Sequence, residues 1–197
     1  MKNKSETRNL LMSFVAFVQN QFGKYIKVIR SDNGQEFHWK EFYDKHDIIH
    51  QTTCIKAPQQ NYVVERKHQH ILNVTRSLIF QSKRHKVFWN YAIFHSMYLI
   101  NRLTSPVIQN KSPHEMLYKF VPDFDNLRIF GCLCFTSTLE NNRNKLDPRA
   151  KKCIFLGFKN GTKGYVVIYT NTGEISVSRN VVFFFAYFFC KVLVNDS

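Results

Sequence analysis

Two acidic residues occupy positions from which carboxylates could bind metal ions. Asp32 lies in the sequence SDNG at 31–34, directly after the β-branched run YIKVIR, and Glu65 lies in QQNYVVERKH, at the expected start of a helix. Two-metal phosphoryl transfer requires carboxylates on separate elements that converge on Mg²⁺ ions about 4 Å apart, because hard cations take oxygen ligands. An Asp at the end of a strand and a Glu at the start of a helix are able to meet that requirement.

Both acidic positions also have ordinary structural explanations. Asp-Asn-Gly is a common tight-turn sequence, and a Glu in the first turn of a helix complements the helix dipole. From the residues alone, the catalytic and the structural interpretations of Asp32 and Glu65 therefore stay open.

The helix expected after Glu65 is rich in basic side chains. They are Arg66, Lys67, Arg76, Lys83, Arg84 and Lys86, with His68, His70 and His85 among them. Lys and Arg together outnumber Asp and Glu by 28 to 14, which gives a net charge of +14 and a pI near 9.7. This balance favours a nucleic-acid partner contacted through its phosphates. The alternatives are a solvated basic face without a specific ligand and an anionic membrane surface.

The cysteines and histidines do not form a recognisable metal motif. His46, His50 and Cys54 are four residues apart, but a fourth ligand at a suitable spacing is lacking, so we expect no zinc site there. Cys132 and Cys134 alternate on a predicted strand, which places both in the core. An odd count of five cysteines without a CxxC pair or a secretory signal indicates a reducing compartment. We expect a protein that is not secreted and does not enter a membrane, because no apolar run reaches about 20 residues.

The elements that must position these residues change in character along the chain. Up to residue 122, helical and strand patterns alternate; after it, short strand-like runs predict a small β-barrel or curled sheet. We therefore predict an α/β chain with a first domain at 1–122, a β-rich domain at 123–183 and an apolar tail at 184–197. The helices are predicted at 10–22, 40–46, 63–82 and 87–103, and strands in the first domain at 25–30 and 48–53.

Several motifs, in this order, resemble the integrase region of copia-type retrotransposon Pol polyproteins, particularly those of plants. The integrase-core motifs are IRSDNGQEF at 29–37, the segment 48–78 with APQQNYVVERKH, FWNYAIFHSMYLINRLTSP at 88–106 and KSPHEMLY at 111–118. LRIFGCLCF at 127–135 and the segments 145–168 and 173–183 resemble the small β domain that follows that core. The resemblance covers nearly everything from Arg8 to Phe183.

The resemblance implies a ribonuclease H-like core in which an Asp-Asp-Glu triad binds two Mg²⁺ (or Mn²⁺) ions and joins element DNA ends to target DNA. By motif, Asp32 is the second Asp of the triad and Glu65 is its Glu, so both would be catalytic and metal-binding. The resemblance also assigns Gln59, Gln60 and Asn61 to a mobile loop near DNA. Arg66, Lys67 and Arg76 are then expected to contact DNA.

The resemblance further implies a nuclear protein, or otherwise a cytoplasmic one, that acts as a homo-oligomer or with an intact integrase. Two departures bear on activity. The first Asp of the family triad would lie upstream of Asp32, which is the first Asp in this sequence. Tyr62 stands where the family motif QQNG has Gly, so a residue free to adopt a positive φ is replaced by a bulky one.

These observations predict an integrase fragment that is inactive or nearly so on its own and binds Mg²⁺ weakly. Two other functions remain open at this point. One is a non-catalytic nucleic-acid-binding module, and the other is a fragment that interacts with an intact integrase.

Overall fold

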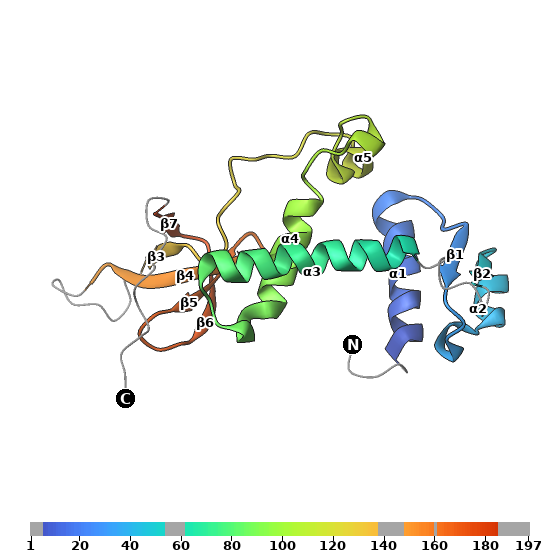
Figure 1. Cartoon of the computed structure of the whole chain (residues 1–197), viewed down its shortest axis with the longest axis horizontal. Coiled ribbons are helices and arrows are strands. Elements are labelled where there is room, and N and C mark those ends of the chain that lie inside the picture. Colours follow the sequence, from blue (N-terminus) through green and yellow to red (C-terminus); the bar gives the residue numbers. More distant parts are fainter. Residues whose placement is uncertain (1–5, 54–61, 138–147, 160, 185–197) are drawn as a thin grey trace. The chain divides into compact units, whose positions relative to one another are not determined.

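The computed structural model describes residues 6–53, 62–137, 148–159 and 161–184, and it divides into two compact units, Met1–His68 and Gln69–Ser197. Figure 1 shows the first unit in blue to cyan and the second in green to red. Within the described residues, none of the helices combines the length and the apolarity needed to cross a membrane.

The first unit contains a pair of parallel strands with two helices. Its elements are α1 (Thr7–Phe22), β1 (Val28–Ser31), the short 3-10 helix η2 (Gln35–Phe37), α2 (Lys40–Lys45) and β2 (Ile49–Thr52). Helix α1 is capped at its C-terminus by Gly23, which has a φ of 60° and donates its N–H to the carbonyl of Gln19. The core of this unit is formed by Val15, Phe42, Tyr43 and Ile48.

Within the described residues, the first unit leaves several apolar side chains of α1 uncovered. Val15 is buried, whereas Leu10, Phe14 and Phe17 are each about half exposed. These three residues follow one another at helical spacing, so α1 carries a second apolar stripe beside the one that packs on α2.

Helix α3 (Tyr62–Ser82) begins in the first unit and continues into the second. Its C-terminal half packs on α4 (Trp89–Ile100), where the buried hydroxyls of Thr75 and Ser96 are 2.8 Å apart. The remaining helical elements are the 3-10 helices η4 (Lys86–Phe88) and η5 (Pro106–Ile108) and the short helix α5 (Pro113–Tyr118). The helices predicted at 63–82 and 87–103 are thus both present, the second as η4 followed by α4.

The second unit also contains a five-stranded antiparallel sheet in the order β6-β5-β4-β3-β7. Its strands are β3 (Leu133–Ser137), β4 (Ala150–Phe158), β5 (Tyr165–Tyr169), β6 (Ile175–Ser178) and β7 (Val181–Phe183). The register shifts between Phe155 and Gly157, and such a bulge increases the local bend of a strand. The strand-rich region predicted after residue 122 is present as this antiparallel sheet.

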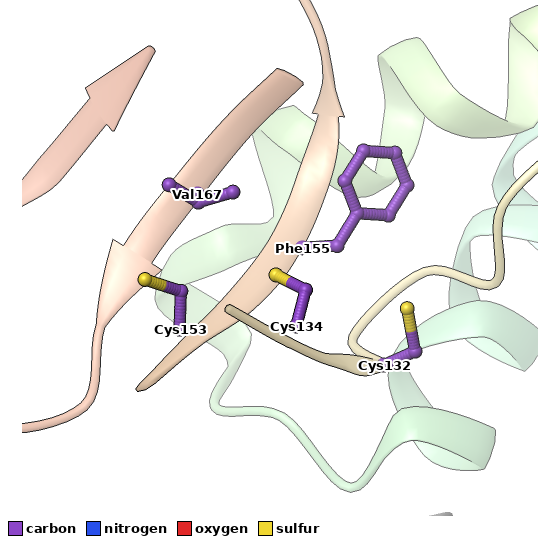
Figure 2. Close-up of a cluster of buried hydrophobic side chains, with 5 residues drawn as sticks. All are labelled: Cys132, Cys134, Cys153, Phe155 and Val167. Atoms are coloured by element: carbon purple, nitrogen blue, oxygen red, sulfur yellow. The ribbon is translucent and has the colours of Figure 1, made fainter. Parts of the chain in front are cut away.

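One face of the sheet carries the buried cysteines (Figure 2). Cys134 on β3 is paired in register with Cys153 on β4, and both lie beside Phe155 and Val167. Cys132, just before β3, belongs to the same cluster, so the prediction that Cys132 and Cys134 are core residues is confirmed. All three thiols are free.

The opposite face of the sheet packs on helices. Leu156 on β4 and Val166 on β5 form a cluster with Ala92 of α4, and Leu78 and Ile79 of α3 pack against it. Because these contacts join α3 and α4 to the sheet, the compact units separate at His68 and Gln69 rather than at residue 122. The limit predicted at 122 follows the change from helical to strand-like sequence patterns instead, and the apolar tail predicted at 184–197 lies almost wholly outside the described residues.

Candidate functional site

Asp32 follows directly on β1, at the edge of the sheet where β1 and β2 both end. The two strands are parallel, with Ser31 opposite Thr52, so their carboxyl ends lie at the same edge, where open α/β sheets commonly bind ligands. Asp32 is exposed. Its Oδ1 accepts a hydrogen bond of 3.1 Å from the Gly34 N–H, which closes the turn.

The turn that carries Asp32 is bonded to the residue after β2. The side-chain amide of Asn33 donates to the carbonyl of Thr53 at 2.7 Å. The Thr53 N–H in turn donates to the carbonyl of Ser31 at 3.2 Å. The segment that leads from Thr53 towards Glu65 therefore starts beside the Asp32 turn.

His50 supports the same turn from β2. Its Nε2 lies 2.8 Å from Ser31 Oγ, and its ring stacks on Tyr43 at 4.4 Å between centroids. Since the single hydroxyl hydrogen of Ser31 is donated to the carbonyl of Asp32 at 2.9 Å, Nε2 acts as the donor to Ser31 Oγ. Burial, assisted by the nearby His38, lowers the pKa of His50, so its neutral form is favoured.

Glu36 is a second carboxylate beside Asp32. A β-carbon placed on Gly34 would lie 2.9 Å from Glu36 Oε2 and 3.0 Å from Asp32 Oδ1, so both carboxylates approach the same side of this glycine. Sequence reasoning did not select Glu36, or Asn33, and considered His50 only as a zinc ligand. The sequence signal that could have found Glu36 and Asn33 is their position within the motif IRSDNGQEF.

Glu65 lies in the first turn of α3 and is exposed together with Arg66 and Lys67. Tyr62, which replaces the glycine of the family motif, begins the helix, and the guanidinium of Arg66 lies 5.1 Å from the centre of its ring. The tyrosine is thus accommodated as a helical residue that forms a cation–π contact.

Arg76 lies further along α3, exposed, and donates to Asn73 Oδ1 at 3.1 Å. The three basic residues predicted to contact DNA therefore all present their side chains to solvent. Gln59, Gln60 and Asn61 lie outside the described residues, as does Cys54.

The described residues offer the donor chemistry of a Mg²⁺ site but not a full set of ligands. Asp32, Glu36 and Glu65 supply the oxygen atoms that this cation prefers. Nevertheless, within the described part of the chain no three His, Cys, Asp or Glu side chains come together in a way that could hold a metal ion. Metal binding at Asp32 and Glu65 stays a prediction.

The sequence is similar to Pol polyproteins of plant retrotransposons. It is 35% identical over 185 residues to the retrovirus-related Pol polyprotein from transposon RE1 of Arabidopsis thaliana. It is 34% identical over 184 residues to the polyprotein from transposon RE2 of the same plant, and 32% identical over 186 residues to that from transposon TNT 1-94 of Nicotiana tabacum. The chain is a homologue of one segment of these polyproteins. The matches cover 93% of this Pol homologue but only 13% to 14% of each relative.

The β-rich part of this Pol homologue also matches the model of a separate domain family. Residues 132–191 match the retroviral polymerase SH3-like domain, a range that includes all five strands from β3 to β7. Among solved structures, the intasome of simian T-cell lymphotropic virus in complex with the PP2A regulatory subunit B56 gamma is similar, with a TM-score of 0.46 and 14% identity. That match covers 92% of this chain and 64% of the other.

Proposed function

We propose that this Pol homologue is a copia-type integrase segment whose family activity is metal-dependent DNA strand transfer. In this proposal the first unit belongs to a ribonuclease H-like core, and Asp32 and Glu65 are two carboxylates of its Asp-Asp-Glu triad. The observation that carries the proposal is the position of Asp32, at the carboxyl end of a parallel strand pair. It stands in a chain that is similar over 93% of its length to Pol polyproteins.

The proposed cofactor is Mg²⁺ or Mn²⁺, held by Asp32 and Glu65. When bound in such a site, the ions activate the attacking hydroxyl and stabilise the leaving oxygen. Two carboxylates give a small divalent cation a mostly watery shell, and the family's first Asp would lie upstream of Asp32. We therefore expect weak cation binding and little or no strand transfer by this chain alone.

The proposed partners are element DNA ends and target DNA, met in the nucleus. Arg66, Lys67 and Arg76 are exposed on one helix, and the net charge of the chain is +14. Exposed cations of this kind contact phosphates and release counterions from DNA. Binding should consequently weaken steeply as the salt concentration rises.

The proposal is tested by strand transfer with the purified chain on a labelled element-end duplex, in Mg²⁺ and in Mn²⁺, beside Asp32→Asn and Glu65→Gln. We expect no transfer by any of the three proteins, and DNA binding that they share and that falls with salt. Metal-dependent transfer that both substitutions abolish would show that the chain is an enzyme by itself. Failure to bind DNA even at low salt would refute the DNA partner.

A non-catalytic nucleic-acid-binding module is the second candidate, favoured by the exposed basic residues of α3 and the incomplete ligand set. In that case Asp32→Asn and Glu65→Gln leave binding and function unchanged, whereas reversal of charge at Arg66, Lys67 and Arg76 reduces affinity and flattens its salt dependence. A fragment that joins an oligomer, either of itself or of an intact integrase, would instead be recognised by its co-purification with a full-length relative.

A further inference from the structure

The loop that follows β1 carries the exposed carboxylate of Asp32 and is fastened at both of its ends by side chains. At its start, Ser31 Oγ donates a hydrogen bond of 2.9 Å to the carbonyl of Asp32, and His50 Nε2 lies 2.8 Å from the same hydroxyl oxygen. At its end, the phenol of Tyr43 donates to the carbonyl of Phe37 at 3.0 Å. Side chains of β1, β2 and α2 therefore hold this loop in place.

We propose that His50 is a positioning residue for the Asp32 carboxylate and acts on it through the hydroxyl of Ser31. This inference rests on the proposed function, because that function is what requires the carboxylate to be held ready for a metal ion. In this role His50 touches neither the metal ion nor DNA. It determines only how the turn that carries Asp32 is held.

The contact with the Asp32 carbonyl also affects the Asp32 side chain. That carbonyl belongs to the peptide group between Asp32 and Asn33, and the hydrogen bond from the Gly34 N–H to Asp32 Oδ1 spans this peptide group. Because a peptide group is planar and turns as one body, its orientation decides whether the Gly34 N–H reaches the carboxylate. The hydroxyl that holds the carbonyl therefore also favours the bonded conformation of the carboxylate.

His50 gives the Ser31 hydroxyl its direction. A hydroxyl has one hydrogen and two acceptor positions, and a donor at one acceptor position favours the rotamer whose hydrogen points to the Asp32 carbonyl. The ring of His50 is itself held by Tyr43, with 4.4 Å between centroids and 17° between planes. Tyr43 is a buried core residue of the first unit, so a continuous path of contacts joins that core to Asp32.

Substitutions at His50 separate its hydrogen bond from its stacking. His50→Phe keeps a ring against Tyr43 and removes the donor, whereas His50→Gln removes the ring and keeps an amide N–H donor. Ser31→Ala removes the hydroxyl through which His50 acts. Gln51→Ala is the matched control, because Gln51 accepts hydrogen bonds of 3.3 and 3.0 Å from Arg30. That contact joins the same two strands on their other face.

The decisive experiment measures the exchange of backbone amides with water by NMR, in the metal-free full chain and in these four variants. The Gly34 N–H should exchange roughly three- to tenfold faster in His50→Phe and in Ser31→Ala, as expected when one net hydrogen bond is lost. His50→Gln should restore most of the protection, and Gln51→Ala should leave it unchanged. The double variant of His50→Phe and Ser31→Ala should exchange no faster than either single variant, because both act on one path.

The Ile49 N–H donates to the carbonyl of Lys27 at 2.9 Å and therefore reports the strand pair itself. Its exchange should stay at the rate of the unaltered chain in the variants of His50 and Ser31. Equal acceleration of the Ile49 and Gly34 amides would mean that the substitutions merely loosen the strands. An unchanged Gly34 amide in His50→Phe would mean that His50 does not act on the loop. Each of these two results would overturn the positioning role.

A second measurement separates this inference from the proposed function. Mn²⁺ added to the unaltered chain should broaden the amide resonances of Asn33 and Gly34, and Asp32→Asn should abolish the effect. His50→Phe should need a severalfold higher Mn²⁺ concentration for the same broadening, and an equal requirement would contradict the inference. Absence of broadening in the unaltered chain would count against the metal site of the proposed function, while the exchange of the Gly34 amide in the metal-free chain would still decide the role of His50.

Discussion

His95 is a titratable side chain in an aromatic environment, on the face of helix α4 that meets the sheet. It is 2% exposed, and the rings of Tyr98, Phe130, Phe155 and Phe158 surround it at 5.6 to 6.2 Å between centroids. Burial lowers the pKa of His95 to about 4, and a hydrogen bond with the backbone of Arg128 opposes this only in part. The folded chain therefore holds His95 neutral at pH 7.

The stability of the second unit should consequently depend on pH through His95. The unfolded chain takes up a proton near the ordinary pKa of 6.5 and the folded chain only near 4, so stability is full above 6.5 and is lost as the pH falls towards 4. The complete loss amounts to about 3 kcal/mol. Urea unfolding at several pH values between 7 and 4 measures it.

The control for this pH dependence is His95→Phe, which keeps an aromatic ring and removes the titration. It should show a shallower decline between pH 6.5 and 4 than the unaltered chain. Declines of equal steepness in the two proteins would mean that other groups of the second unit, such as His114, whose pKa burial also lowers, carry the effect.

At the scale of elements, the contact between the end of α3 and the turn before β3 depends on Gly131. This glycine has a φ of 76°, and a β-carbon added to it would lie 2.5 Å from the Cβ of Ser82, the last residue of α3. Its N–H also donates to the carbonyl of Phe155 at 2.8 Å, so the backbone is held where it is. Both the conformation and the space thus require glycine.

Gly131→Ala should destabilise the second unit by about 2–4 kcal/mol, as strained backbone and steric overlap add together. Gly173→Ala is the matched control, since Gly173 has a φ of 69° but nothing within 4 Å of an added β-carbon. It should lose only about 1 kcal/mol. The two free energies of unfolding are compared by denaturant titration, and equal losses would contradict a role for the Ser82 contact.

Sequence periodicity predicted most of these elements, because helical and alternating patterns identify residues that share a face. Periodicity does not identify what covers that face. Val63 and Val64 continue the apolar stripe of α3, yet they are 66% and 68% exposed, whereas Leu78 and Ile79 pack on the sheet cluster.

The candidate site was predictable only in part for a related reason. Asp32 and Glu65 were selected by residue type and motif, without reference to their neighbours. His50 and Asn33 gain their contacts from strand pairing, which brings Thr53 and His50 beside residues 31–33, whereas Glu36 lies near Asp32 through the local turn at Gly34. A pairing between strands about twenty residues apart leaves no local sequence signal.

At the scale of the whole molecule, composition and contacts divide the chain differently. The composition changes near residue 122, where helical patterns give way to strand-like runs, but the contacts separate at His68 and Gln69. The reason is that α4 and the second half of α3 bury their apolar side chains against the sheet. A change in composition marks a change in secondary structure, and only packing decides which elements form one unit.

The reactivity of the three buried cysteines, Cys132, Cys134 and Cys153, depends on whether the sheet of the second unit is open. Burial raises the pKa of Cys132 to about 11 and raises that of Cys134 as well, so the thiolates that react with alkylating reagents are scarce while the sheet is intact. Alkylation of these thiols therefore requires opening of the sheet, and its rate reports how often that happens.

Pulsed alkylation followed by peptide mass spectrometry should thus find Cys132, Cys134 and Cys153 modified together, at a rate that Gly131→Ala increases and Gly173→Ala increases less. Independent modification of one of the three in the unaltered chain would show that the sheet opens in parts. Helices α3 and α4 cover the other face of this sheet. The rate of cysteine alkylation would therefore also indicate how often α3, the helix that carries Arg76, loses its contacts with the sheet.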